Sequence, residues 1–192
     1  MLDHLTDKRI ILASKSPRRQ ELLKGLDIDF DIQTREVDES YPAQISPKKV
    51  PEFLAEKKAD AFNDLLTTDT IIITSDTIVI QGDTILEKPG NVEEGKAMIR
   101  QLSGKSHTVV TGVCIRSKEK NIHFSDETKV QFMELEEAEI DYYVRKYKPF
   151  DKAGSYGVQE WIGYIGIQQL TGSYYTVMGL PLHKVYAHLK TF

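Results

Sequence analysis

Short aliphatic runs alternate with longer amphipathic stretches along this chain, a pattern typical of mixed α/β proteins. The aliphatic runs are rich in Ile and Val, and each is short enough for a buried strand. They predict strands at 8–14, 70–80, 84–86, 109–115 and 122–132, and the run at 70–80 is interrupted by Ser75-Asp76-Thr77. Gly82-Asp83 separates the second and third of these strands and predicts a two-residue hairpin turn.

The amphipathic stretches predict helices, and several of them carry residues suited to helix ends. The predicted helices lie at 17–26, 50–66, 92–102, 136–147 and 181–189. Ser16 and Asn91 suit N-cap positions, Pro17 suits a first helical position, and Gly104 suits a C-terminal stop. The stretch 149–179 is rich in Gly and Tyr and has little regular period, so the pattern predicts no element there.

Composition restricts the class of partner. The 192 residues include 25 Lys and Arg against 29 Asp and Glu, so no large positive field exists to bind a nucleic-acid polymer or an anionic membrane. No apolar run approaches the roughly 20 residues of a membrane span, and the first residues do not resemble a signal peptide. The single cysteine, Cys114, favours a reducing compartment. We expect a cytoplasmic protein that forms one domain over 1–192 without a separable linker.

A candidate anion site lies in the loop that follows the first predicted strand. The hydroxyls of Ser14 and Ser16 precede Arg18 and Arg19, which fall in the first turn of the next helix. Cations there face the positive end of the helix dipole, which costs about 0.3–1 kcal/mol each. Together with free backbone N–H groups, these donors suit a phosphate. In the alternative interpretation, both arginines point outward and meet surface carboxylates.

Two charged residues occupy positions where the pattern predicts apolar side chains. Lys58 lies on the apolar stripe of the helix at 50–66, where it either extends to the edge or reaches into a polar cleft. Asp76 follows the hydrophobic run 71–74, at the predicted end of a strand, where α/β folds place their ligands. Its carboxylate can coordinate Mg²⁺ or take a proton from water, or it can simply form a turn.

Two weaker signals come later in the chain. Lys88 lies just past the predicted hairpin, where a solvated turn lysine is the simplest interpretation. Gln159 follows a segment with two glycines that would let the backbone approach a ligand closely. Its amide could bind a base edge as both donor and acceptor, although a plain turn with a surface glutamine also explains these residues.

Several short motifs occur in a fixed order along the chain. They are Ala13–Arg19, Ser75–Thr77, Lys88-Pro89, Asp151–Tyr156 with Gln159, and Gly172–Tyr174 with Gly179–Leu182. Together they resemble the Maf family, also called septum formation proteins, which are regarded as nucleoside triphosphate pyrophosphatases. The resemblance extends over essentially the whole chain, from Ile10 to the last helix.

The resemblance implies an α/β fold with a mixed twisted sheet, flanking helices and two lobes around a central cleft, similar to inosine triphosphate pyrophosphatases. The implied reaction converts a nucleoside triphosphate and water into the monophosphate and pyrophosphate with a divalent metal cation, Mg²⁺ or Mn²⁺. Asp76 is the implied proton acceptor. Arg18, Thr77 and Gln159 match positions tied to substrate choice, and their combination resembles the dTTP/UTP branch. The resemblance also allows a homodimer, with the aromatic-rich segment 156–175 as either contact or core.

Two positions depart from the family pattern. Glu87 stands where Gly often precedes Lys-Pro, and Thr176 stands where Asn is common. We expect Glu87 to face solvent, because an inward carboxylate would repel phosphates. Of the implied properties, the substrate range is the one on which these departures bear.

The chemistry of the reaction supports the same residues. Hydrolysis between the α- and β-phosphates needs cations, a metal and an oriented water. Asp76, with Glu39, can hold Mg²⁺ through carboxylate oxygens and waters. The positive charge would come from Arg18, Arg19, Lys58 and Lys88. We therefore expect these far-apart segments to converge, with Asp76 activating the attacking water.

Two other functions stay open at this point. The substrate could be a purine or modified-purine triphosphate, hydrolysed as a house-cleaning reaction. Alternatively, the chain could be a non-catalytic nucleotide-binding regulator of cell division. Asp76 favours catalysis, because an extra carboxylate does not help a sensor bind polyphosphate unless a metal occupies the site.

Overall fold

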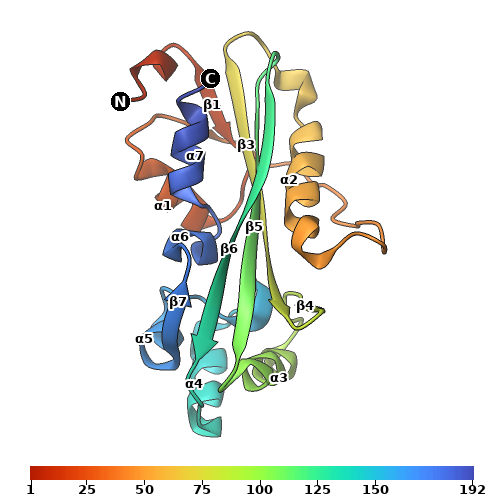
Figure 1. Cartoon of the computed structure of the whole chain (residues 1–192), viewed down its shortest axis with the longest axis vertical. Coiled ribbons are helices and arrows are strands. Elements are labelled where there is room, and N and C mark those ends of the chain that lie inside the picture. Colours follow the sequence, from red (N-terminus) through yellow and green to blue (C-terminus); the bar gives the residue numbers. More distant parts are fainter. The chain divides into compact units, whose positions relative to one another are not determined.

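The computed structural model describes all 192 residues and confirms the predicted mixed α/β class. The strands are β1 (Arg9–Leu12), β2 (Asp31–Ile32), β3 (Thr70–Gln81), β4 (Thr84–Leu86), β5 (Ser106–Arg116), β6 (Asn121–Phe132) and β7 (Ile167–Thr171). They form one seven-stranded sheet in the order β2-β1-β3-β5-β6-β7, with β4 paired to β3 outside this path (Figure 1). The sheet is mixed, since β1 pairs in parallel with β2 and β3 whereas β4 and β7 pair antiparallel with their neighbours.

Seven α-helices accompany the sheet. They are α1 (Pro17–Lys24), α2 (Val50–Asp60), α3 (Val92–Leu102), α4 (Glu137–Tyr147), α5 (Trp161–Gly166), α6 (Tyr174–Met178) and α7 (Leu182–Leu189). Single 3₁₀ turns lie at Asp3–Leu5, Pro47–Lys49, Asn63–Leu65 and Ala153–Ser155. All five predicted helices are present, and the predicted hairpin turn joins β3 to β4 with Gly82 at φ +60°.

Two predictions about elements are wrong. The helix predicted to reach residue 66 ends at Asp60, because Asn63 and Asp64 are poor helix formers and bind Arg116 and Arg35 instead. The stretch 149–179, where no element was predicted, contains α5, β7 and α6. Strand β7 exists through its pairing with β6, a tertiary contact that leaves no local period in the sequence.

The chain divides into two compact units. Unit 1 contains residues 1–76, 111–126 and 179–192, and unit 2 contains residues 77–110 and 127–178. The division falls within β3, between Asp76 and Thr77. The predicted single domain with a cleft between two lobes stays a prediction.

The core of unit 1 lies between the parallel strands and helix α2. Ile11 and Ile72 pack with Phe62, and α2 presents Ala55 and Ala59 to Cys114 on β5. Cys114 is fully buried, and burial raises the pKa of its thiol to about 12. The thiol is therefore protonated and acts as a small core side chain.

The core of unit 2 lies against α3 and α4, which pack side by side (Figure 1). His107 is buried in this core, with Nε2 2.7 Å from the hydroxyl of Tyr156 and its ring edge-on to Phe132. Burial lowers the pKa of His107 to about 4, so the imidazole is neutral at pH 7.

The depressed pKa of His107 predicts an acid-sensitive fold. The unfolded chain binds the proton near pH 6.5 and the folded chain only near pH 4, so stability falls as the pH drops through this window. We expect the free energy of unfolding to fall by about 2 kcal/mol between pH 7 and pH 5, measured by urea titration. His107→Gln should flatten this slope, and an unchanged slope in the variant would assign the effect to other groups.

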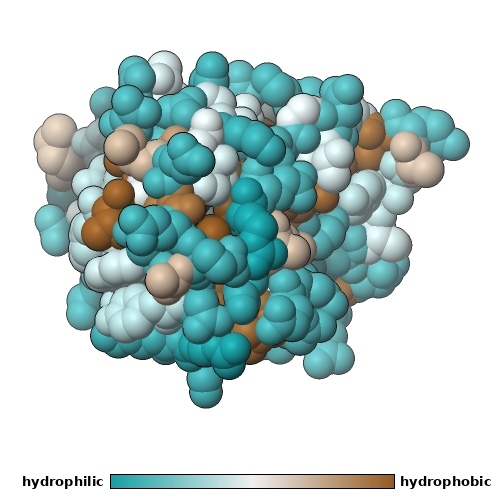
Figure 2. All heavy atoms as spheres, turned by 90° about the horizontal axis from the view of Figure 1, so that it is seen from below, coloured by the Kyte–Doolittle hydropathy of each residue, from teal (hydrophilic) through white to brown (hydrophobic).

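The surface is predominantly polar on the face drawn in Figure 2, where hydrophobic areas are small and separate. No helix combines the length and the apolarity that crossing a bilayer would require.

Candidate functional site

Asp76 lies in the middle of β3, and the prediction that it ends a strand is wrong. The strand continues because the apolar residues 78–80 lead into the pairing with β4. Its parallel neighbour β1, however, stops opposite Ile73, so Asp76 lies three residues beyond the last paired position. Asp76 therefore lies past the carboxyl end of β1, the kind of place where α/β sheets bind ligands, and only 9% of the residue is exposed.

Lys58 brings two carboxylates together. Its Nζ lies 2.5 Å from Oδ1 of Asp76 and 2.8 Å from Oε1 of Glu39. The Lys58 side chain is 17% exposed and the Asp76 side chain 12%, so their ion pair is shielded from water. Of the two interpretations of Lys58, the structure selects the one in which it reaches into a polar cluster.

The loop that carries Glu39 is bound to α2 through the two sequence neighbours of Glu39, whose own side chain is 49% exposed. Asp38 accepts hydrogen bonds from the backbone N–H of Ser40 at 3.0 Å and from Lys57 Nζ at 3.0 Å, and Lys57 also reaches the carbonyl of Ser40 at 2.9 Å. The hydrogen bond from the Ser40 hydroxyl, followed by these contacts, lowers the pKa of Asp38 to about 2. Lys57 and Lys58, consecutive on α2, thus bind the loop and the Glu39 carboxylate respectively.

Arg19 connects three of the sequence motifs within unit 1. Its Nε donates to the carbonyl of Gly179 at 2.9 Å and its Nη1 to the carbonyl of Ser75 at 2.9 Å, while Ser75 Oγ also donates to Gly179. Burial lowers the pKa of Arg19, and the nearby Asp76 carboxylate opposes this shift. The interpretation of Arg19 as an outward surface arginine is therefore wrong, and part of its guanidinium binds the scaffold.

The loop before α1 has the predicted cap position without the predicted cap bond. Ser16 is the N-cap residue of α1, but its side chain makes no capping hydrogen bond, and its N–H donates to Ser14 Oγ at 3.2 Å. Ser14 is buried, and Arg18 is half-buried in the first helical turn. The two hydroxyls and the helix start are thus adjacent, as an anion site requires.

Three predicted site residues belong to unit 2. Thr77 is half-buried on β3, and Lys88 is exposed just after β4. Glu87 is exposed, as expected. Gln159 is half-buried, and its Oε1 is buried without a hydrogen-bond partner. A buried acceptor without a partner costs about 1–3 kcal/mol, which favours a ligand group or water as its partner.

The contacts that fix the loop around Gln159 were not predicted from the sequence. Lys152 is buried, and its Nζ lies 3.1 Å from Oε1 of Glu160. Tyr143 on α4 donates its hydroxyl to the other oxygen of Glu160 and accepts the N–H of Gly157 at 3.0 Å. The loop that carries Gln159 is thus fixed on both sides of this residue. Lys152 lies in one of the sequence motifs, but nothing local indicated that it pairs with Glu160, or that Glu160 also binds Tyr143 on α4.

The family model for Maf-like proteins matches residues 9–192 of this chain. The chain belongs to the Maf-like protein family. The resemblance noted from the sequence motifs is therefore confirmed. The chain is 51% identical over 193 residues to the dTTP/UTP pyrophosphatase of Parabacteroides distasonis, covering 100% of both chains. It is 51% identical over 195 residues to that of Porphyromonas gingivalis (strain ATCC 33277), covering 100% of this chain and 98% of the relative. Against that of Bacteroides thetaiotaomicron it is 49% identical over 191 residues, covering 99% of each.

Two solved structures resemble the Maf-like chain more weakly than these relatives do. The Ham1 protein of Staphylococcus aureus aligns with a TM-score of 0.48 and 14% identity, covering 65% of this chain and 72% of that one. A nucleoside-triphosphatase/dITP/XTP pyrophosphatase from Mycobacterium abscessus aligns with a TM-score of 0.41 and 16% identity, with the same coverage.

Two carboxylates of this Maf-like chain are candidates for a metal site. No group of three or more His, Cys, Asp or Glu side chains gathers closely enough to cage an ion, in any of the 192 described residues. Asp76 and Glu39 nevertheless converge on Lys58. Mg²⁺ is commonly held by one or two carboxylates together with substrate phosphates and waters, so these residues fit a site that substrate completes.

The buried Lys152–Glu160 pair predicts a large stability effect. Lys152→Met would leave the Glu160 carboxylate, 18% exposed, without its cation. We expect a loss of about 2–3 kcal/mol in the free energy of unfolding, measured by urea titration. Lys8→Met removes an ion pair whose Asp69 partner is 65% exposed, and it should change stability by less than about 0.5 kcal/mol. Equal effects of the two variants would show that burial of the pair does not matter.

Proposed function

We propose that this chain is a nucleoside triphosphate pyrophosphatase that hydrolyses dTTP and UTP to the monophosphate and pyrophosphate. Full-length relatives that share about half of its residues are named for this activity. The names agree with the activity expected from the sequence motifs.

The observation that carries the proposal is the cluster of Lys58, Asp76 and Glu39 near the half-buried Arg19. We assign to Asp76 the role of proton acceptor for the water that attacks the α-phosphorus. Lys58 holds the Asp76 carboxylate in place and supplies positive charge toward the phosphates. Ser14, Ser16 and Arg18, at the start of α1, are assigned to phosphate binding.

Charge balance explains why a cation belongs to the proposal. The two carboxylates, Asp76 and Glu39, carry −2, and Lys58 with Arg19 carries +2, so these four residues are neutral together. A triphosphate brings several negative charges, so further positive charge is needed. Mg²⁺ or Mn²⁺, held by Asp76 and Glu39, would polarise the phosphate oxygens. We assign Arg18 and Lys88 to neutralise the remaining negative charge of the triphosphate.

Thr77, Lys88 and Gln159 are assigned to substrate binding on the basis of their motifs. The Gln159 amide offers an acceptor and a donor, which suits the N3–H and adjacent carbonyl of uracil and thymine. Its unpartnered Oε1 supports this assignment. Guanine and hypoxanthine present a similar pair of groups, so purines belong in the test.

The test is pyrophosphate release from a panel of triphosphates with Mg²⁺ or Mn²⁺. We expect dTTP and UTP to be hydrolysed at least about tenfold faster, in kcat/KM, than CTP, GTP, ITP or 7-methyl-GTP. Faster turnover of a purine would support the second enzyme function, and binding without product would support a regulator. In H₂¹⁸O, the label should enter the monophosphate, because the proposed attack is on the α-phosphorus.

The proposed compartment is the cytoplasm, which suits a chain whose only cysteine is a buried free thiol. The proposed assembly is a homodimer, with 156–175 as the candidate contact. Light scattering on the purified chain tests the assembly directly.

A further inference from the structure

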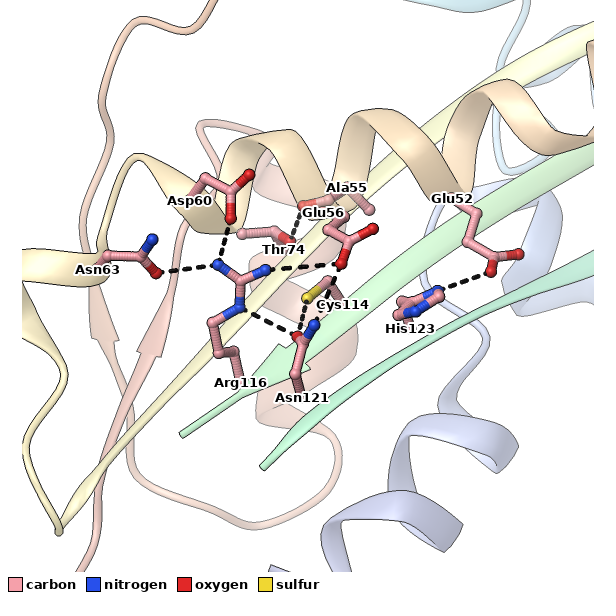
Figure 3. A network of polar contacts seen from close by, with 10 residues as sticks. All are labelled: Glu52, Ala55, Glu56, Asp60, Asn63, Thr74, Cys114, Arg116, Asn121 and His123. Atoms are coloured by element: carbon pink, nitrogen blue, oxygen red, sulfur yellow. Dashed lines mark hydrogen bonds and ion pairs between the residues drawn. The ribbon is translucent and has the colours of Figure 1, made fainter. Parts of the chain in front are cut away.

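Thr74 makes a buried contact between β3 and the helix that carries Lys58. Its Oγ1 donates a 2.6 Å hydrogen bond to the carbonyl oxygen of Ala55, and Thr74 is fully buried (Figure 3). Ala55 lies inside α2, where a helical carbonyl already accepts a backbone N–H from the next turn. The bond from Thr74 is therefore not needed to satisfy Ala55, and it links two elements.

This bond lies directly beside the ion pair of the candidate site. Thr74 and Asp76 are two residues apart on β3, so their side chains leave the same face of the strand. Ala55 and Lys58 are three residues apart on α2, so they share a helix face. A slip of α2 by one residue moves it about 1.5 Å along its axis, enough to break the 2.5 Å contact between Lys58 and Asp76.

The small residues of β5 let α2 approach closely but do little by themselves to fix its axial position. A Cβ on Gly112 would lie 2.2 Å from the backbone of Pro51 and Glu52, so only glycine fits under the start of the helix. Cys114, two residues on, packs against small alanines of α2. Apolar contacts of this kind set the distance between helix and strand and resist sliding weakly, because they have no direction.

The polar contacts at the ends of α2 are more exposed than Thr74. Arg116 Nη1 lies 2.5 Å from Asp60 and 2.9 Å from Asn63, and His123 lies 2.8 Å from Glu52 at the other end (Figure 3). The Asp60 side chain is 57% exposed and His123 is 44% exposed. Arg116 itself is buried, but each of these contacts has one exposed partner whose side chain can turn to follow a small shift, whereas the short Thr74 hydroxyl is enclosed by the core and cannot.

We propose that Thr74 is a positioning residue that fixes the axial position of α2, and with it the contact between Lys58 and Asp76. The inference rests on the proposed function, because it matters for turnover only if this pair acts on a triphosphate. Thr74 itself would touch neither substrate nor metal.

The test compares two buried threonines of the same strand. Thr74→Val keeps the shape of the side chain and removes the bond to Ala55 without leaving a buried donor unpaired. Thr70→Val is the matched control, because the Thr70 hydroxyl is also buried but bonds Thr67 instead of α2. We expect Thr74→Val to lower kcat/KM for UTP about tenfold and Thr70→Val to change it less than twofold. Thr74→Ser, which keeps the hydroxyl that Thr74→Val removes, should leave kcat/KM within about threefold of wild type.

A double-mutant cycle separates positioning from general destabilisation. In a Lys58→Met background, Thr74→Val should change kcat/KM less than twofold, because there is no longer an ammonium group to position. The same cycle can be measured with the affinity for α,β-imido-UTP, an analogue that cannot be hydrolysed. This measurement does not depend on the residual activity of the Lys58→Met background.

The outcomes discriminate between the two proposals. A tenfold loss in both backgrounds, or equal losses in Thr74→Val and Thr70→Val, would overturn the role of Thr74. Absence of turnover by the wild-type chain with every triphosphate of the panel would overturn the proposed function instead.

Discussion

Asp76→Asn is expected to lower kcat/KM for dTTP and UTP by about 10³-fold while the chain stays folded. An amide has nearly the shape of the carboxylate but cannot accept the proton of the attacking water, and a well-placed general base contributes about 10²–10⁴-fold. The amide also loses the charge that holds Lys58 Nζ at 2.5 Å. The measurement is pyrophosphate release at saturating Mg²⁺, with circular dichroism to verify folding.

The control for this variant is Asp69→Asn, which also removes an aspartate paired with a lysine. Asp69 pairs with Lys8 at 3.0 Å, and 65% of the Asp69 side chain is exposed. Asp69→Asn should therefore leave kcat/KM within about twofold of the wild-type value. If Asp76→Asn also stayed within a few-fold of wild type, Asp76 would not be the proton acceptor. Glu39 would then be the next carboxylate to test.

Lys58→Met is expected to lower kcat about 10²-fold and, at the same time, to lower the Mg²⁺ concentration needed for half-maximal rate. Without the ammonium, Asp76 and Glu39 face one another with only a cation from solution to neutralise them, so the metal binds more tightly. Turnover still falls, because positive charge is lost from the phosphates. The measurement is the rate of pyrophosphate release as Mg²⁺ is varied at saturating UTP.

Lys96→Met is a closely matched control for this variant. Lys96 is 13% exposed and pairs with Asp141 at 2.8 Å, much as the 17% exposed Lys58 pairs with Asp76. We expect its kcat and Mg²⁺ dependence to stay within about twofold of wild type. If Lys58→Met raised the Mg²⁺ requirement instead, Lys58 would support metal binding rather than compete with it.

Local patterns were sufficient for elements whose signal lies within a few consecutive residues. Asn91 caps α3 by accepting the N–H of Glu94, and Gly82 takes the positive φ that the hairpin needs. The same kind of signal failed for β7, which depends on pairing with β6. The helix predicted to 66 failed for the same reason, since distant arginines bind Asn63 and Asp64.

The candidate site likewise has features that the sequence alone indicated and features that only the tertiary structure showed. The sequence alone identified Lys58 and Asp76 as charges in apolar patterns, and the order of motifs identified the family, because both signals lie in residue type and spacing. Only the tertiary structure showed that Lys58 binds both Asp76 and Glu39, that Arg19 binds backbone carbonyls, and that Lys152 meets Glu160. Each of these contacts joins groups from separate parts of the chain. The chemistry of a side chain determines what it can bind, but the packing of the chain determines which group it meets.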